Sequence, residues 1–248
     1  MLAIATQNPD AVAETYVRQH IRMIAPDDTV VVYLDGEGES LAGLNVFKLK
    51  TRQPGVWGLS SKMVGLWNLF LDDYSGAVLG AEKRRLIRYF EDQGVSALLA
   101  EFGPTGCALR PVCRQSGVKL VVNFHGYDAT VMGRRWSIRR AYRRLARDAI
   151  HFVCGSVHFS DVLVGLGIPR EKISVIPCGI EAEFFQADRI KDPALVVAVG
   201  RLTEKKAPQL TIEAFALVKK AIPNACLELI GDGPLRPVCE SKIEAFGL

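Results

Sequence analysis

Short apolar runs alternate with longer amphipathic segments along most of the 248-residue chain. Runs rich in β-branched residues are typical of strands, and apolar residues spaced three or four positions apart are typical of helices. In the first 180 residues the pattern predicts strands at 2–6, 29–35, 46–50, 95–103, 118–126, 150–156 and 172–177. It predicts helices at 9–24, 81–94, 105–116, 134–149 and 157–166. Near-continuous apolar strands alternating with helices indicate a parallel sheet covered on both faces, which is a Rossmann-like α/β unit.

A second and shorter alternation follows the polar segment 187–194, which we interpret as a linker. It consists of a strand at 195–199, a helix at 208–221, a strand at 225–230 and a final helix that runs to Leu248. A parallel sheet this narrow buries its two faces poorly. We therefore expect an N-terminal domain at 1–186 and only the beginning of a second Rossmann-like domain at 195–248.

Composition narrows the class of protein. Hydrophobic residues make up 49% of the chain and charged residues 23%, as in ordinary soluble domains, and the net charge of +4 is too mild to argue for nucleic-acid binding. The six cysteines form no Cys-x-x-Cys pair, so we expect reduced thiols and no metal site. The N-terminus lacks the features of a signal peptide, and no apolar run approaches the roughly 20 residues of a membrane span. We expect a cytoplasmic protein, soluble or peripheral at the inner face of the membrane.

The clearest candidate for ligand chemistry is a basic cluster between a predicted strand and a predicted helix. Gly200 and Arg201 follow the strand at 195–199, and Lys205 and Lys206 precede the helix that begins at Pro208. A helix N-terminus carries free N–H groups and partial positive charge, so an arginine and a lysine beside it would hold a diphosphate. The spacing alone fits a solvated basic loop equally well, and it lacks the Walker A pattern.

A second group of polar residues lies at other strand ends and helices of the first unit. His125 directly follows a strand, and a histidine side chain there suits hydrogen bonding or proton transfer. Asp128 is near enough in the sequence to orient its ring or to bind a hydroxyl. Glu101 and Gly103 end another strand, and Glu14 lies in the first predicted helix. These are candidate substrate contacts, although a histidine satisfied by backbone groups and an exposed helix carboxylate are the simpler interpretations of His125 and Glu14.

Two further segments are distinctive in composition. Residues 134–148 hold seven arginines around Trp136, Ile138, Tyr142 and Leu145. Anionic lipid or nucleic acid could bind such a helix, but a solvated helix face is favoured. Residues 55–71 are apolar and aromatic with one lysine, which favours a core or flap segment over a surface that meets a lipid-linked acceptor.

Taken in order, these segments resemble the family 4 (group 1) glycosyltransferases. The resemblance rests on AETYVRQHI (13–21), LLAEFGPTG (98–106), VVNFHGYD (121–128), GIPREKISVIPCGIEAEFF (167–185) and AVGRLTEKKAPQLTIEAFALV with PNACLELIGDGPLR (198–236). Each segment is a weak signal alone, but the ordered set covers nearly the whole chain. Glu101 stands where the family often has a histidine, and Ala207 stands where it usually has a glycine.

The resemblance implies a GT-B fold and transfer of a sugar from a nucleotide-sugar donor, with retention of anomeric configuration, to a glycan or lipid-linked acceptor. It implies that Arg201 and Lys206 hold the donor diphosphate, with Lys205 one position earlier, and that His125 meets the transferred sugar. No metal or other cofactor is expected. Because the family's donor domain continues well beyond the position that matches Leu248, the resemblance also implies C-terminal truncation and the loss of the Glu…Glu motif that binds the nucleotide ribose and donor sugar.

Other activities remain open on sequence grounds. A truncated fragment or a binding subunit of a split glycosyltransferase would bind an acceptor or a partner without transferring a sugar. A sugar-nucleotide epimerase with the same fold fits the motif series less well. A dehydrogenase is least consistent, because the chain lacks the Gly-x-Gly-x-x-Gly fingerprint.

Overall fold

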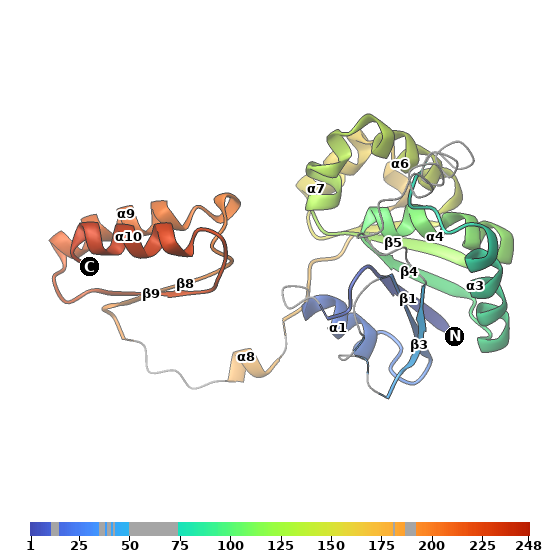
Figure 1. Cartoon of the computed structure of the whole chain (residues 1–248), viewed down its shortest axis with the longest axis horizontal. Helices are drawn as coiled ribbons and strands as arrows, with labels where there is room; N and C mark the ends of the chain where they lie inside the picture. The colour runs from blue at the N-terminus through green and yellow to red at the C-terminus, as the bar shows by residue number, and fades with distance from the viewer. Residues whose placement is uncertain are drawn as a thin grey trace, which may run out of the picture. The chain divides into compact units, whose positions relative to one another are not determined.

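The computed structural model describes residues 1–10, 15–34, 38, 41, 43–49, 74–180, 182–186 and 192–248. The chain divides into two compact units, Met1–Gly179 and Ile180–Leu248, coloured blue to yellow and orange to red in Figure 1. The fold class predicted from the sequence is confirmed, since both units are built on parallel strands with helices. The expected linker lies partly outside the described residues, so the predicted domain boundaries stay a prediction.

In the described residues of the first unit, seven strands form a parallel sheet in the order β3-β2-β1-β4-β5-β6-β7. Its strands are β1 (Leu2–Thr6), β2 (Thr29–Tyr33), β3 (Asn45–Lys48), β4 (Ala97–Glu101), β5 (Lys119–Phe124), β6 (His151–Cys154) and β7 (Ile173–Val175). From β1 the chain builds outward to β3 and then returns to place β4 on the other side of β1. Ligands of doubly wound sheets bind where the strand order reverses in this way, at the carboxyl ends of the strands.

Helices pack on this sheet in two groups. Its helices are α1 (Thr15–Met23), α3 (Gly80–Gln93), α4 (Gly103–Ser116), α5 (Tyr127–Thr130), α6 (Trp136–Asp148) and α7 (Val157–Gly165), with short 3₁₀ turns η2 (Met132–Arg134) and η3 (Arg170–Lys172). Buried side chains of α3, α4, α6 and α7 join alternate residues of β4, β5 and β6 in the main core. A smaller cluster joins Val17 and Ile21 of α1 to Ile4 and Val31. The two clusters follow the period-2 alternation of the strands.

The first helix departs from the sequence prediction. Asn8-Pro9 predicts a helix from residue 9, but Pro9 and Asp10 lie in a turn and α1 begins at Thr15; residues 11–14 are outside the described part. The Oδ1 atom of Asn8 accepts a hydrogen bond from the backbone N of Asp10 at 2.9 Å, and Oδ2 of Asp10 accepts one from the backbone N of Gly38 at 2.8 Å. These bonds stabilise the turn at Pro9 and Asp10.

The second unit contains β8 (Leu195–Val199) and β9 (Cys226–Ile230), paired in parallel, with α8 (Glu183–Gln186), η4 (Glu204–Lys206), α9 (Pro208–Ala221) and α10 (Arg236–Phe246). Figure 1 shows α9 and α10 on the same side of the two strands. Buried hydrophobic residues of these helices and of the loops beside the strands form the core of this unit: Leu202, Ile212, Phe215, Ala225 and Cys239. Val199 is 76% exposed and Val197 49% exposed. In the described part of this unit, these two strands therefore lack cover on one face, as their number predicts.

Candidate active site

Glu101, the last residue of β4, joins two histidines from distant parts of the first unit. Its Oε1 atom lies 2.7 Å from Nδ1 of His20 on α1, and its Oε2 atom lies 2.6 Å from Nε2 of His125, which follows β5. Nδ2 of Asn123 donates to Oε2 as well, at 3.2 Å. The Glu101 side chain is completely buried, so every one of these bonds is made inside the protein.

The pKa values of this cluster reflect two opposing effects. Burial by itself raises the pKa of Glu101, but the hydrogen bonds and charges of His125 and His20 outweigh it and hold that pKa below its usual value. The hydrogen bond to Glu101 raises the pKa of His20, against the opposing effect of burial. An ionised carboxylate only accepts hydrogen bonds, so each imidazole presents an N–H to it.

Aromatic rings hold the His125 imidazole on two sides. The ring of Tyr16 stacks on it with centroids 4.3 Å apart and planes 30° apart, and the ring of Phe102 lies 4.7 Å away at 57°. Phe102 has a φ of 74°, a left-handed conformation that is uncommon for a non-glycine residue. A strained conformation of this kind persists only where the surrounding structure holds the backbone in place. Residues with such conformations are often found at functional sites.

The Asp128 carboxylate binds backbone N–H groups around His125, whereas the His125 ring is hydrogen-bonded to Glu101. Its carboxylate accepts hydrogen bonds from the backbone N of Gly103 at 2.9 Å, of His125 at 3.1 Å and of Gly126 at 2.9 Å. Burial raises the pKa of Asp128 despite these bonds and the nearby His125. Of the two roles that the sequence leaves open for Asp128, contact with the imidazole ring is made by Glu101 instead, and binding of a substrate hydroxyl stays a prediction.

Gly103, a candidate contact in the sequence, occupies a tightly packed position. A Cβ atom built on it would lie 2.4 Å from Cε1 of Phe124 and 2.7 Å from the hydroxyl of Tyr142. Gly103, Glu101 and Asp128 are all buried, with Asp128 only 2% exposed. These three residues are therefore not presented at the protein surface in this structure. Glu14 lies outside the described residues.

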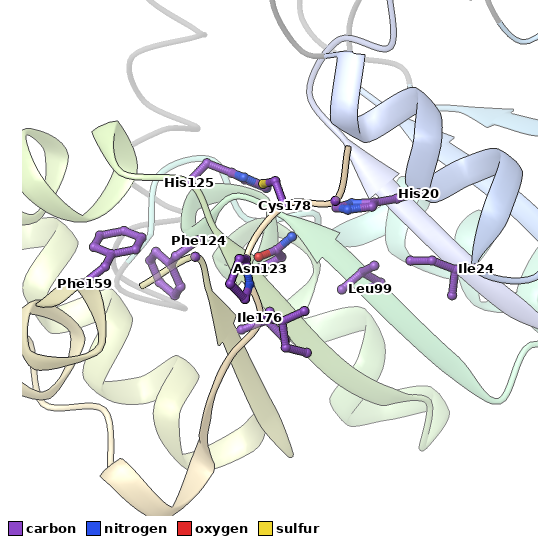
Figure 2. A pocket seen from close by; sticks show the side chains of 13 residues that line it. His20, Ile24, Leu99, Asn123, Phe124, His125, Phe159, Ile176 and Cys178 are labelled. Atoms are coloured by element: carbon purple, nitrogen blue, oxygen red, sulfur yellow. The ribbon is translucent and has the colours of Figure 1, made fainter. Parts of the chain in front are cut away.

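A cavity of about 430 Å³ opens beside the two histidines. Apart from His20, Asn123 and His125, it is lined mostly by apolar groups: Ile24, Leu99, Phe124, Val153, Gly155, Phe159, Ile176, Pro177, Cys178 and Gly179. Figure 2 shows Phe124 and Phe159 toward one end and Ile24 toward the other, with His20 and His125 above the floor of Leu99, Asn123 and Ile176. A mostly apolar pocket with a few polar groups is typical of a site for a small organic ligand.

Three residues around Glu101 and His125 are not among the candidates that the sequence offers: Tyr16, His20 and Asn123. Tyr16 and His20 are four positions apart, which places them on the same helix face. This periodicity draws attention to the segment, but only the fold reveals that this face meets β4 and β5. Asn123 lies within a run that the sequence predicts as an apolar strand.

The basic cluster of the second unit adopts the strand-turn-helix arrangement that the sequence predicts. A separate cavity of about 230 Å³ is lined by Gly200, Arg201, Lys206, Pro208 and Thr211 together with Ala198, Val199, Leu202 and Leu229. Arg201 and Lys206 are exposed, and Pro208 begins the 14-residue helix α9. The fold brings Arg201 and Lys206 to one hollow at a helix N-terminus, whereas Lys205 does not line it.

The loop after β9 packs closely against the backbone of residues that line this hollow. Cβ atoms built on Gly231 and Gly233 would lie 1.9 Å from the carbonyl oxygen of Gly200 and 2.5 Å from that of Leu202. The backbone N of Leu202 donates to the carbonyl oxygen of Asp232 at 2.9 Å. The close approach of two backbones therefore explains why glycine occupies both positions.

The arginine-rich segment forms α6, an amphipathic helix. Its apolar residues Ile138, Tyr142 and Leu145 are buried, and Trp136 at its N-terminus is 72% exposed. Exposed arginines lie along or just before it: Arg134, Arg135, Arg140, Arg143 and Arg147. Among the described helices we find none with the length and apolar character that a membrane crossing requires. The described residues also contain no group of three or more metal-ligating side chains.

Comparison with known proteins relates both units to one class of enzyme. The family described as Glycosyltransferase Family 4 matches residues 13–184, and that described as Glycosyl transferases group 1 matches residues 179–248. A putative colanic acid biosynthesis glycosyltransferase, WcaL of Escherichia coli, is 29% identical over 181 residues, covering 68% of this chain and 44% of that protein. The amylovoran biosynthesis glycosyltransferase AmsK of Erwinia amylovora is 33% identical over 153 residues, covering 58% of this chain and 37% of that protein.

Solved structures share the fold. Anabaena HepE in complex with UDP superposes with a TM-score of 0.72 at 16% identity, over 100% of this chain and 66% of HepE. Sucrose-phosphate synthase from Thermosynechococcus elongatus gives a TM-score of 0.65 at 14% identity, over 100% of this chain and 68% of that protein. The chain thus spans less than half the length of the curated relatives described above. Because the family match extends over more than half of the residues, the chain belongs to glycosyltransferase family 4 and continues into the group 1 glycosyltransferase domain.

Proposed function

We propose that the protein transfers a sugar from a nucleotide-sugar donor to a glycan or lipid-linked acceptor, with retention of configuration, in polysaccharide or glycolipid biosynthesis. The observation that carries the proposal is the match of both units to glycosyltransferase families in their usual order. The named functions of WcaL and AmsK, in colanic acid and amylovoran biosynthesis, support the polysaccharide assignment.

The donor diphosphate is assigned to the hollow at the start of α9. Arg201 and Lys206 both line it, and the free N–H groups and partial positive charge of the helix N-terminus add to their attraction for an anion. When the sugar leaves, negative charge builds up on the nucleoside diphosphate, and fixed cations stabilise that charge without a metal ion. The structure of HepE with UDP-glucose, a protein of the same fold, supports a nucleotide sugar as the donor class.

The acceptor side is assigned to the cavity beside His125. Its apolar lining suits a sugar face or a lipid-linked group, and His125 supplies a directed hydrogen-bonding nitrogen. Glu101 and Asp128 then act by holding His125, one through its ring and the other through its backbone. Direct substrate contact by Glu14, Gly103 or Lys205 stays a prediction.

A measurement of turnover by the protein tests the proposal. Nucleotide-sugar consumption and sugar transfer are measured with lipid-linked and oligosaccharide acceptors for the parent protein and for Arg201→Ala and Lys206→Ala. We expect each substitution to lower turnover by about 100-fold or more, because each removes a fixed charge from the leaving group. Lys220→Ala, at the far end of α9, removes one positive charge outside the hollow and is the matched control. Near-normal turnover in both variants, or no sugar transfer by the parent protein, would contradict the proposal.

We further propose peripheral association with the inner face of the membrane through the exposed side of α6. Trp136 suits the interface between lipid and water, and each arginine near an anionic surface contributes about 1 kcal/mol. Co-sedimentation with phosphatidylglycerol vesicles is expected, and phosphatidylcholine vesicles are expected to bind less. Replacement of Arg140, Arg143 and Arg147 by glutamine should reduce binding about tenfold or more, whereas Arg170→Gln, which removes an exposed arginine paired with Asp161, should not. Equal binding to both lipids would contradict this assignment.

A further inference from the structure

The cluster around Glu101 contains one buried carboxylate and two imidazoles, and its charge is not balanced if both imidazoles are neutral. We propose that His20 is a positioning residue for His125: it carries the positive charge that balances Glu101, and it thereby keeps His125 neutral with its proton on Nε2. The charge assignment stands on the geometry of the first unit, and only its meaning for sugar transfer rests on the proposed function.

The hydrogen-bond directions follow from the contacts of Glu101. Both carboxylate oxygens lie within 2.7 Å of a histidine nitrogen, and neither is exposed to solvent. A fully buried carboxylate is stable as an anion only when donors and a positive charge compensate it. Because Nε2 of His125 and Nδ1 of His20 both face this anion, both nitrogens carry protons. The lowered pKa of Glu101 agrees with this arrangement.

The positive charge is assigned to His20 because its side chain is the more hydrated of the two. His20 is 25% exposed, whereas His125 is 10% exposed and its ring lies between Tyr16 and Phe102. Burial disfavours the charged form of histidine, so the cation is less costly on His20. The raised pKa of His20 agrees with this assignment.

Other groups near His125 also influence whether its ring is charged or neutral. The aromatic faces of Tyr16 and Phe102 would attract a cation, and so would Asp128. The Asp128 carboxylate, however, already accepts three backbone hydrogen bonds. From the remaining elements around the cavity, Asn123 of β5 is neutral, and the Cys178 thiol follows β7. We therefore expect the hydration difference between the two histidines to decide where the charge lies.

This arrangement determines what His125 presents to a ligand. In the neutral ring with its proton on Nε2, the second nitrogen, Nδ1, carries a lone pair and accepts a hydrogen bond. Within the described residues neither Nδ1 of His125 nor Nε2 of His20 has a hydrogen-bond partner. His125 thus accepts from a substrate hydroxyl, whereas a charged His125 would donate to it. In the proposed reaction, His20 sets this difference without touching the reacting atoms.

Nitrogen NMR of the whole chain, labelled at its histidines, tests the assignment without any need for turnover. The chain has four histidines, so single His→Asn variants assign all the signals. At neutral pH we expect both ring nitrogens of His20 to be protonated, and the shifts of His125 to be those of a neutral ring protonated at Nε2. His151→Asn is the matched control, since His151 is hydrogen-bonded to Ser174 away from Glu101.

The decisive variants are His20→Asn and His20→Ala. The asparagine retains an N–H at the position of Nδ1 but carries no charge, and the alanine removes both. In both variants the cation should move to His125, whose two nitrogens then become protonated at neutral pH, while Glu101→Gln should leave both histidines neutral. A charged His125 in the unmodified chain, or a neutral His125 that persists in His20→Asn, would overturn the proposal. Because no substrate is involved, these outcomes are independent of whether the chain transfers sugars.

Discussion

Gly103 illustrates how strongly one residue in the first unit is constrained. The space for its Cβ is already filled by the ring of Phe124 and the hydroxyl of Tyr142, and both side chains are buried. Its backbone N also donates to Asp128, so a shift of the backbone would disturb the loop that carries His125. The stability of the sheet and the geometry of the site are therefore coupled at this position.

Gly103→Ala should destabilise the first unit by about 1–3 kcal/mol, because the new methyl group overlaps rigid aromatic rings. Denaturant unfolding followed by circular dichroism measures the change. Gly165→Ala is the matched control, since a Cβ at Gly165 meets nothing within 4 Å and alanine favours the helix. Equal stability of Gly103→Ala and the unmodified chain would contradict the packing described for this site.

Ala207, in the second unit, is a position where a substitution should raise the free energy of unfolding. It has a φ of 48° and a ψ of 50°, a left-handed conformation that costs an L-residue about 1–2 kcal/mol, and it stands where the family usually has glycine. Ala207→Gly should raise the free energy of unfolding by about 1 kcal/mol. Ala214→Gly, at an exposed position inside α9, should lower it by a similar amount. A loss of stability in Ala207→Gly would show that the left-handed turn before α9 is not present in solution.

At the scale of helices and strands, the contact between α1 and β4 makes stability depend on pH. Glu101 has a lowered pKa, so its contribution is lost as pH falls through that value from above the ordinary 4.5. His20 has a raised pKa, so its contribution is complete below the ordinary 6.5 and is lost as pH rises through its value in the folded protein. The contact should therefore stabilise the first unit most in the window between these two ordinary values.

Glu101→Gln should flatten the loss of stability on the alkaline side of that window, because it leaves neither histidine with a carboxylate partner. Denaturant unfolding is measured from about pH 6 to about pH 8, the range in which histidine loses its charge. The difference in unfolding free energy between the unmodified chain and Glu101→Gln should shrink as pH rises. His151→Asn serves as the control because its partner is a neutral serine. A difference that stays constant across this range would contradict an ionic contact between α1 and β4.

Local sequence patterns predict the bounds of several strands and helices, but they do not predict which of these elements contact one another. The strand at 195–199 and the helix at 208–221 have the observed bounds, because Gly200 ends one and Pro208 begins the other. Asn8-Pro9 predicts a helix from residue 9, whereas Pro9 and Asp10 lie in a turn and residues 11–14 are outside the described part. The role of Glu101 could not be predicted, since its partners His20 and His125 are 81 and 24 residues away in the sequence. Spacing within a short segment carries no information about such pairs.

At the scale of the whole molecule, each unit has a different proposed task. The first presents a cavity with a held histidine, and the second presents a hollow with two cations at a helix N-terminus. The family matches follow the same division, one ending and the other beginning near Gly179. The two tasks can be tested separately, because each group of residues lies within one unit.

The most direct test of the account is an NMR titration of the nitrogen-labelled chain with UDP and with GDP. We expect saturable shifts of the backbone amides at Gly200, Arg201 and the first turn of α9, and weaker binding, by about tenfold or more, in Arg201→Ala and in Lys206→Ala. Lys220→Ala should bind as the unmodified chain does. If neither nucleotide perturbs this loop, or if both variants bind as tightly as the unmodified chain, the assignment of the donor diphosphate to this hollow is wrong.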